Sequence, residues 1–385
     1  MTPTPQYKNT GRDSFFGNYL FDQAVPQDHF LRALKELFDW EELGQRLLRL
    51  YKGYGVVGRP PYDPVLMFKM LFLCYLYNLS ERDTERFVNE NIPAHFFLDL
   101  ALDQKAPDHS TLTPFKGRLV SKGNWQELQC VFDTLLQQAR DQGLRLGRIQ
   151  LVDSVHTQAD VNAEKDRGRQ EKGQAARDAD ARVVNKGERD VVEADGRKVK
   201  KQIRYRGYKT HVSVDAKTGL VTSVLPSWGD SADNKAFPQL LEHDLSLHLP
   251  THTYGGDKAY DDTDIFERIE QQKMHVGIKL RSIRTRKKDP NKQRWLDLKK
   301  TPKYRAATKL RSRVERPFAQ AKDKHGFERC RYLGRIKYGL QSFMTFLVVN
   351  AKRLVKLLTG ITFRELAKGR RKEVFQPVHT SLPWA

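Results

Sequence analysis

The sequence predicts an α/β protein with a mixed sheet, preceded by an all-helical region. Apolar residues recur at helical spacing between residues 28 and 145, which predicts helices packed on one another. From Leu146 onward, short β-branched runs alternate with amphipathic helical runs, and this alternation is typical of α/β folds. A charged segment, residues 161–206, follows the first of these runs and holds 14 basic and 9 acidic residues without a clear period. It is expected to be a long exposed insertion.

The helical region should be built around one buried helix. Pro64 opens a nearly all-apolar run that continues to Leu79, and proline is favoured at the first position of a helix. Ser80 is a suitable N-cap for the next, more polar helix, and Thr113 with Pro114 resembles the cap and first position of another. Short helices around a buried one fit either a helix-turn-helix reader of DNA or a plain packing module. The apolar period does not separate the two.

The α/β region should contain five strands and two helices. In chain order these are a strand in LGRIQLVDSVH, the charged insertion, a hairpin in YKTHVSVDAKTGLVTSVLPSW, a helix in NKAFPQLLEHDLSLHL, a strand in THTYGGD, a helix in DTDIFERIEQQK and a strand in MHVGIKL. A basic linker (281–303) then leads to a helical segment that carries Glu315. The expected parts are an N-terminal extension (1–27), a helical domain (28–145), an α/β domain (146–335) and a C-terminal packing helix with its tail (336–385).

The charge balance indicates a polyanionic partner. Lys and Arg number 68 against 47 Asp and Glu in 385 residues, which gives a formal net charge of +21. Such an excess favours nucleic acid, with an anionic membrane surface as the second candidate. A membrane span is not expected, because the most apolar run, Val65 to Leu79, is short and contains Lys69. We expect no secretion signal, since the first 25 residues lack an apolar core.

Two further classes of protein are disfavoured. The three cysteines, Cys74, Cys130 and Cys330, form no CxxC pair. This pattern predicts a reducing cytoplasm with neither a structural zinc site nor a disulfide framework. The GGDK stretch at 255–258 lacks the length and the GK[ST] ending of a P-loop, so nucleotide hydrolysis is not supported.

Three carboxylates stand out by position. Asp153 lies near the end of the first expected strand, Asp257 lies just past a later strand, and Glu315 lies in the helical segment after the last strand. Ligand sites gather at the carboxyl ends of strands in α/β sheets. Three carboxylates held together suit two Mg²⁺ ions, which prefer oxygen ligands. Two glycines before Asp257 are expected to let a bulky phosphate approach.

Six segments together resemble the DDE transposases of bacterial insertion sequences, specifically the insertion sequence five group with its ribonuclease H-like catalytic core. They are GRPPYDP, PDHSTLTPFKGRL, LVDSVHTQADV, GYKTHVSVDAKTGLV, GGDKAYDD and RSRVERPFAQAK, in this order between about residues 55 and 325. The resemblance implies a ribonuclease H-like mixed-sheet catalytic core behind a helical domain that binds DNA or dimerises. It assigns catalysis and metal binding to Asp153 on the first strand, Asp257 after the fourth and Glu315 on a later helix.

The resemblance also implies a reaction. A transposase of this kind binds the terminal inverted repeats of its insertion sequence, cleaves the DNA and joins the 3′-hydroxyl ends to target DNA by two-metal-ion phosphoryl transfer. The implied cofactor is Mg²⁺, two ions per site, with Mn²⁺ able to substitute. The implied partners are double-stranded DNA and a second copy of the chain, at the nucleoid in the bacterial cytoplasm, with no membrane partner.

The family signature of Tyr, Arg, Glu and Lys is matched in part. Arg311, Glu315 and Lys322 stand at the last three positions, whereas Thr308 stands at the Tyr position, with Tyr304 one turn earlier. Positions 311, 315 and 322 would share one helix face, so Arg311 and Lys322 could hold DNA phosphates beside Glu315. Pro317 should kink or restart the helix, which would weaken this shared face.

Further side chains are candidates for DNA contact. Residues 303–337 hold 12 basic and 3 acidic residues, a density that suits a phosphate-backbone path. The RYRGYK stretch interleaves Arg204, Arg206 and Lys209 with tyrosines, as DNA-contacting loops do, although a plain strand edge explains it nearly as well. Lys258 is a phosphate contact or an ordinary surface lysine. Trp228 is a stacking surface for a flipped base or a core residue.

Two rival functions stay open. A ribonuclease H-like nuclease such as a resolvase would use the same carboxylates without strand transfer. A catalytically silent regulator derived from a transposase would only bind DNA. The presence of Asp153, Asp257 and Glu315 argues against the second rival.

Overall fold

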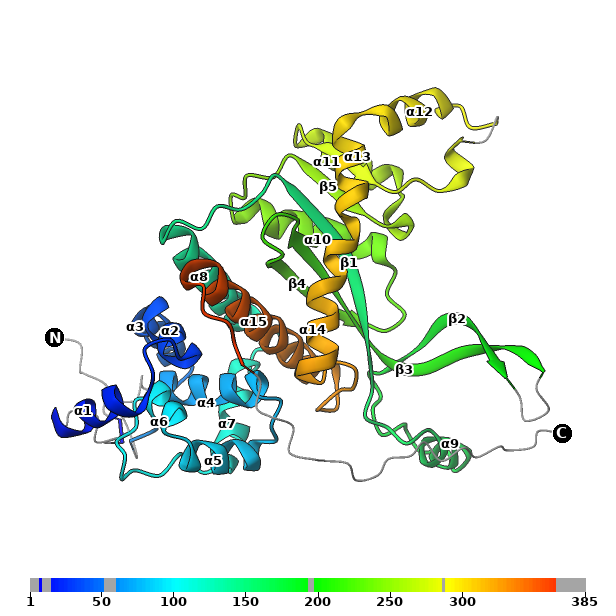
Figure 1. Cartoon of the computed structure of the whole chain (residues 1–385). Coiled ribbons are helices and arrows are strands. Elements are labelled where there is room, and N and C mark those ends of the chain that lie inside the picture. Colours follow the sequence, from blue (N-terminus) through cyan, green and yellow to red (C-terminus); the bar gives the residue numbers. More distant parts are fainter. Residues whose placement is uncertain (1–6, 9–14, 52–59, 193–196, 286–287, 365–385) are drawn as a thin grey trace.

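The computed structural model of the chain describes residues 7–8, 15–51, 60–192, 197–285 and 288–364. Its helical region lies at one end of the molecule, around the apolar helix α4 (Figure 1). The helices are α1 (Phe15–Ala24), α2 (Phe30–Leu37), α3 (Trp40–Leu48), α4 (Pro64–Leu76), α5 (Glu81–Glu90), α6 (Ile92–Leu98), the 3₁₀ helix η2 (His109–Thr111), α7 (Leu112–Leu119) and α8 (Gln126–Asp141). Nearly every residue of α4 is buried, as the sequence predicts.

The helix starts expected from the sequence are largely confirmed. Pro64 is the first residue of α4, and the Asp63 carboxylate accepts a hydrogen bond from the Val65 N–H at 2.7 Å. Ser80 caps α5 by accepting from the Asp83 N–H at 3.1 Å. The expected start at Thr113 was wrong, because α7 follows η2 directly and begins at Leu112.

Lys69 is buried inside α4 because it has a specific partner. Its ammonium lies 2.7 Å from the Asp99 carboxylate and 4.9 Å from the centre of the Trp40 ring. A buried charge is tolerated when it is paired in this way. Within the described ranges, no helix is long and apolar enough to cross a membrane.

The α/β region contains a mixed sheet with β1 at its centre. The strands are β1 (Ile149–Gln158), β2 (Arg182–Val192), β3 (Lys198–Asp215), β4 (Val221–Trp228), β5 (Thr253–Gly256) and β6 (His275–Ile278). β1 pairs antiparallel with β3 on one side and parallel with β5 on the other. β6 continues the parallel side, and β4 pairs with β3. The five expected strands, the mixed sheet and the preceding helical region are confirmed.

The charged insertion is more regular than expected. It forms α9 (Ala163–Glu171) and a two-stranded ribbon of β2 with the first half of β3. The ribbon extends away from the rest of the molecule (Figure 1), and Val183 and Val199 are exposed on it. It departs from the sheet at Gly207, where a Cβ would lie 2.3 Å from the Thr157 carbonyl. Most of its described side chains are exposed, as expected of a long exposed insertion, and its regular elements are not marked by a period in the sequence.

Helices cover both faces of the sheet. On one face lie α10 (Asp233–Ser246), α11 (Thr263–Gln271) and α12 (Lys292–Lys300), which share a core with Val152 of β1. The other face carries α13 (Pro302–Leu310), the 3₁₀ helix η5 (Arg311–Val314), α14 (Glu315–His325) and α15 (Arg335–Thr359). The expected basic linker was wrong in part, because it contains the 3₁₀ helix η4 (Ser282–Thr285) and α12 with its buried Trp295.

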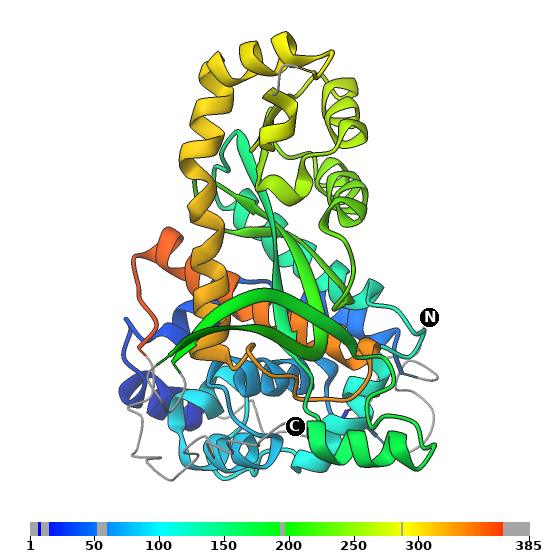
Figure 2. The ribbon, with the colours of Figure 1, turned by 90° about the vertical axis from the view of Figure 1, so that its right-hand side faces the viewer.

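The apolar helix α15 joins the two regions. It lies between the helical region and the sheet (Figures 1 and 2), and residues of both belong to the same hydrophobic core. Tyr338 stacks on Tyr208 of β3 with ring centroids 4.6 Å apart, and its hydroxyl lies 2.6 Å from that of Thr210. The predicted packing helix is therefore confirmed, and it fixes the sheet against the helical region.

Helix α13 crosses the parallel strands at two glycines. A Cβ added to Gly277 would lie 2.3 Å from the Ala307 Cβ, and one added to Gly255 would lie 2.8 Å from Leu151 and 3.3 Å from Ala307. These strand positions hold glycine because the helix packs directly onto the strand backbone.

We expect Gly277→Ala to destabilise the fold by about 2–3 kcal/mol, because the added methyl overpacks the contact between α13 and β6. Urea unfolding followed by circular dichroism measures the change. Gly117→Ala is the control, since nothing lies within 4 Å of a Cβ at this exposed helical position, and it should be neutral or stabilising by up to about 1 kcal/mol. Ala307→Gly should partly rescue Gly277→Ala. Equal effects of Gly277→Ala alone and in the double variant would contradict the packing assignment.

Candidate active site

Two of the predicted carboxylates, Asp153 and Asp257, each come directly after one member of the same residue pair on neighbouring strands. Val152 of β1 pairs with Gly256 of β5 in a parallel ladder. Asp153 and Asp257 are the next residues of the two strands. Strands in a sheet lie about 4.8 Å apart, so this register brings the two carboxylates to the same place at the edge of β5.

Asp153 is half-buried on β1, and the pKa of its carboxyl is raised. Burial raises the pKa of its carboxyl to about 6, the Ser154 N–H opposes this rise, and the charges of Asp257 and Asp233 add to it. The hydrogen bond from Ser154 is 2.8 Å long. Arg311 lowers the pKa of Asp153 by a smaller amount. Asp153 therefore lies within reach of two other carboxylates and one guanidinium.

Asp257 begins the 3₁₀ helix η3 (Lys258–Tyr260), which it caps by accepting from the Ala259 N–H at 2.8 Å. Tyr260 ends this helix and is fully buried. Burial and the charges of Asp233, Asp153 and Asp257 hold the pKa of the Tyr260 hydroxyl well above its ordinary value. This hydroxyl has no hydrogen-bond partner among the described residues, so a polar group stands unsatisfied beside three carboxylates.

Asp233 is the carboxylate that sequence reasoning missed. It is the first residue of α10, and its Oδ1 lies 3.3 Å from His211 Nδ1 and 3.5 Å from Lys209 Nζ. Burial opposes ionisation, but hydrogen bonds from His211 and Ser154 and the charge of Lys209 lower the pKa of Asp233. In the sequence it resembles an ordinary helix-start residue. Only its position opposite β1 and β3 links it to Asp153.

Glu315 does not join the other two predicted carboxylates. It is the first residue of α14, its side chain is 62% exposed, and it lies 4.0 Å from the Arg311 guanidinium. Pro317 falls in the first turn of α14, where a helix needs no N–H donor, and η5 separates α14 from α13. Arg311 thus stands between Glu315 and Asp153 and interacts with both.

The glycine interpretation was wrong. The Cβ positions of Gly255 and Gly256 are filled by protein: Leu151 and Ala307 lie beside the first, and Val152 and Tyr260 beside the second. The missing side chains of these glycines make room for α13 and Tyr260, so no space is left there for a phosphate.

The expected DNA contacts fall into two groups. Arg204, Lys258 and Trp228 are exposed, and Arg311 and Lys322 are half-buried. The Arg335 guanidinium lies 4.2 Å from the centre of the Trp228 ring, so one face of this ring is covered by a cation.

Two other expected contacts also serve the fold. Lys209 is buried, and its ammonium donates to the Ser231 carbonyl at 2.8 Å, so this residue is not retained as a DNA contact. Arg206 donates to the Ala181 carbonyl at 2.8 Å and so holds the start of the ribbon. Because Arg206 is half-buried and a guanidinium has further N–H donors, its DNA contact stays a prediction.

Tyr304 does not replace the signature tyrosine. It is buried, and its hydroxyl accepts from the Leu280 N–H at 3.3 Å. Thr308, at the signature position, has a buried hydroxyl without a hydrogen-bond partner among the described residues.

In the described part of the chain, one group of three has its ligand atoms within 4.8 Å of one another, namely Glu85, Asp108 and His109. It lies in the helical region. His109 Nδ1 is 2.7 Å from the Glu85 carboxylate, and Asp108 caps η2. Asp153 and Asp257 form no such compact group with either Glu315 or Asp233.

Two family models match the chain. Residues 19–118 match the family described as Transposase domain (DUF772), and residues 168–351 match the Transposase DDE domain. Together they span most of the helical region, the strands β2 to β6, and α14, and they leave out β1. The chain belongs to the DDE transposases. The second match contains Asp257 and Glu315 but begins after Asp153.

Solved transposases are among the similar structures. The piggyBac transposase synaptic complex with hairpin DNA has a TM-score of 0.42 and 10% identity, over 88% of this chain and 77% of that one. The Mos1 transposase paired-end complex with the left transposon end has a TM-score of 0.20 and 12% identity, over 71% and 82%. Scores this low carry no argument about the reaction of the present transposase.

The residues of this transposase fit the divalent metal that its family implies. Asp153, Asp257 and Asp233 supply carboxylate oxygens, the ligand type that hard divalent cations prefer. Burial, and after it the charges of Asp257 and Asp233, raise the pKa of Asp153, and a cation would relieve the repulsion between these carboxylates. The unsatisfied Tyr260 hydroxyl is a polar group that would complete such an environment.

We expect Asp153→Asn to stabilise the metal-free transposase at pH 8 by up to about 3 kcal/mol and to change its stability little at pH 4. The folded-state pKa of about 6 lies above the ordinary value, so the stability supplied by the protonated carboxyl is lost as the pH rises through 6. Urea unfolding in EDTA at both pH values measures this. Asp264→Asn, at an exposed position in the first turn of α11, is the control without such a gain. A pH-independent difference for Asp153→Asn would contradict the assignment.

Proposed function

We propose that this transposase binds the terminal inverted repeats of its insertion sequence, cleaves the DNA and joins the 3′-hydroxyl ends to target DNA. The observation that supports this most is the in-register placement of Asp153 and Asp257 on neighbouring parallel strands. Both steps are in-line substitutions at phosphorus, so one site suffices for the two. We assign the chain to the insertion sequence five group of transposases, and we expect it to act in the bacterial cytoplasm.

The proposed cofactor is Mg²⁺, two ions per site, with Mn²⁺ able to substitute. When bound, these ions would activate the attacking oxygen and stabilise the leaving oxygen. Asp153 and Asp257 would hold them, with Glu315 completing the set. Asp233 would add negative charge from the start of α10. Lys209 and His211 hold Asp233 in place from β3.

Arg311 would orient Glu315 and the DNA. It is close to both Glu315 and Asp153, so it partly neutralises the cluster in the absence of substrate. A phosphodiester that reaches Asp153 would offer the guanidinium a stronger, bidentate partner. Transfer of Arg311 to this phosphate would free Glu315 to turn toward the aspartates.

The proposed DNA surface surrounds this cluster. Lys258 follows Asp257 directly, Lys322 lies along α14 from Glu315, and Arg204 lies on the exposed ribbon. Cations at these places would contact phosphates without reading sequence. Trp228 would offer its ring to a base. We assign sequence reading or dimerisation to the helical region, with one subunit of a homodimer serving each inverted repeat.

We expect Asp257→Ala to reduce cleavage at the inverted repeats at least about 1,000-fold, the effect of losing about 4 kcal/mol of transition-state stabilisation. Electrophoresis of labelled end fragments in Mg²⁺ measures cleavage, and gel shift should show DNA affinity within about threefold of wild type. Asp264→Ala is the matched control, because this carboxylate lies only seven positions further along the chain, at an exposed place in α11. Cleavage by Asp257→Ala at the wild-type rate would refute the site assignment.

The wild-type protein, tested on two DNA substrates, separates the rival functions. With pre-cleaved ends and a supercoiled target plasmid, a transposase gives joined products. A ribonuclease H-like nuclease gives none while still cutting the intact ends. A silent regulator derived from a transposase binds the ends and leaves them intact.

A further inference from the structure

A small cationic cavity lies on another side of the helix that carries Glu315. It has a volume of about 110 Å³, and its polar lining comes from Lys217, Arg313, Arg316, Gln320 and Arg353. The floor includes the buried Val349 of α15. None of its lining residues is a carboxylate, so four cationic side chains line the cavity without an acidic residue among them. We propose that this cavity binds one phosphate group of the DNA backbone, at a subsite separate from the reacting phosphodiester.

The cations are held in place by the backbone around the turn between β3 and β4. Arg313 donates to the Ala216 carbonyl at 2.7 Å, and Arg353 donates to the Thr218 carbonyl at 2.7 Å. The Asp215 carboxylate fixes this turn by accepting from Gly147 and Thr218. A guanidinium has five N–H donors, so both arginines keep donors for a ligand. A ligand would therefore meet cations that are already oriented.

The size of the cavity suits a phosphate group. Its volume of about 110 Å³ is well above the ~10–15 Å³ that one water molecule needs, so the cavity has room for a phosphate group.

The cavity is near the carboxylate cluster but distinct from it. At 100° per residue, Arg316 and Gln320 lie about 100° and 140° around α14 from Glu315. Asp215 pairs with Gln150, three positions before Asp153 on β1, which corresponds to about 10 Å along the strand. Three base steps of a duplex cover about the same distance. A DNA molecule that presents one phosphodiester to Asp153 can thus place another phosphate in the cavity.

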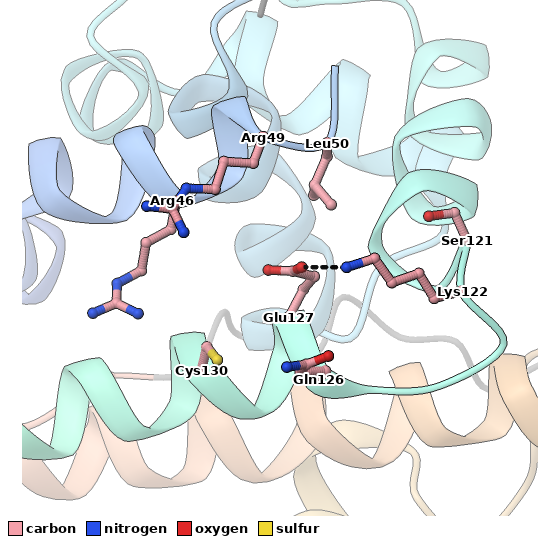
Figure 3. Close-up of a pocket in the computed structure, with 8 residues that line it drawn as sticks. All are labelled: Arg46, Arg49, Leu50, Ser121, Lys122, Gln126, Glu127 and Cys130. Atoms are coloured by element: carbon pink, nitrogen blue, oxygen red, sulfur yellow. Dashed lines mark ion pairs between the residues drawn. The ribbon is translucent and has the colours of Figure 1, made fainter. Parts of the chain in front are cut away.

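A second basic cavity shows the contrast. It lies in the helical region, has a volume of about 350 Å³, and is lined by Arg46, Arg49 and Lys122 together with Glu127 and Cys130 (Figure 3). Lys122 lies 3.7 Å from Glu127, and Arg46 lies 3.3 Å from Glu42. Two of its three cations are therefore already neutralised by carboxylates, whereas the cavity beside α14 has none in its lining.

The inference rests on the proposed function, and salt dependence tests it. Fluorescence anisotropy would measure binding of a labelled duplex that carries the end sequence, in EDTA, over a range of KCl concentrations. We expect Arg316→Gln to reduce the slope of log K against log[salt] by about 0.9, the value for one phosphate contact. The reduction should be equal for a scrambled duplex, because phosphate contacts do not read sequence. Arg316→Lys should keep the slope, because it keeps the charge.

Arg268→Gln is the control, at an exposed position on α11 outside the cavity. An unchanged slope in Arg316→Gln, or an equal loss in Arg268→Gln, would overturn the inference while leaving the proposed function intact. Absence of DNA binding by the wild-type protein would overturn both.

A second measurement distinguishes the source of the phosphate. Inorganic phosphate replaces chloride at constant ionic strength, and thermal unfolding is recorded. If phosphate stabilises the wild type but not Arg316→Gln, and the two proteins show the same DNA slope, the cavity binds free phosphate and the DNA assignment is wrong. A lower DNA slope in Arg316→Gln supports the DNA backbone as the ligand.

Discussion

The parallel pairing of β1 with β5 is the constraint on which the site depends. Residues 153 and 257 are far apart in sequence, and they become neighbours only because Val152 pairs with Gly256. Slipping this register by one residue would turn one aspartate to the opposite face of the sheet. The register is held from both faces, by Ala307 against Gly255 and by Tyr260 against Gly256. Packing of apolar and glycine residues thus determines where the charges meet.

Three carboxylates in one place repel each other, and the surrounding residues limit this repulsion unequally. Asp233 has Lys209 and His211 beside it, and its pKa is lowered. Asp153 has no comparable partner, and its burial raises its pKa to about 6. Arg311 is shared between Asp153 and Glu315. In the metal-free protein, the ionised form of Asp153 is therefore unfavourable, and binding of a divalent cation or a proton would relieve this. Such perturbed carboxyl groups are common in functional sites.

Much of the fold could be predicted because buried faces leave a period in the sequence. β1, β3 to β6, α4 and α15 each bury an apolar face or are buried all round. The β2–β3 ribbon was missed because most of its described side chains, apart from Val184 near its base, are exposed, so no alternation marks it. Asp153 and Asp257 could be expected near each other from their places at strand ends, and Asp233 could not, because a carboxylate at a helix start looks the same with or without a site. The correction at Lys209 has a similar cause, because a sequence does not show which backbone carbonyls a cation will meet.

The ribbon has a mechanical consequence. β3 is one continuous strand whose second half pairs with β1 beside Asp153 and whose first half is the ribbon. The nine residues before Gly207 reach about 30 Å from the sheet. At Gly207 the backbone lies against the Thr157 carbonyl, and the Arg206 guanidinium donates a hydrogen bond to the Ala181 carbonyl. These contacts fix the base of the ribbon. It therefore acts as a cantilever: a load applied near its tip is carried as a bending moment into the strand that borders the carboxylates.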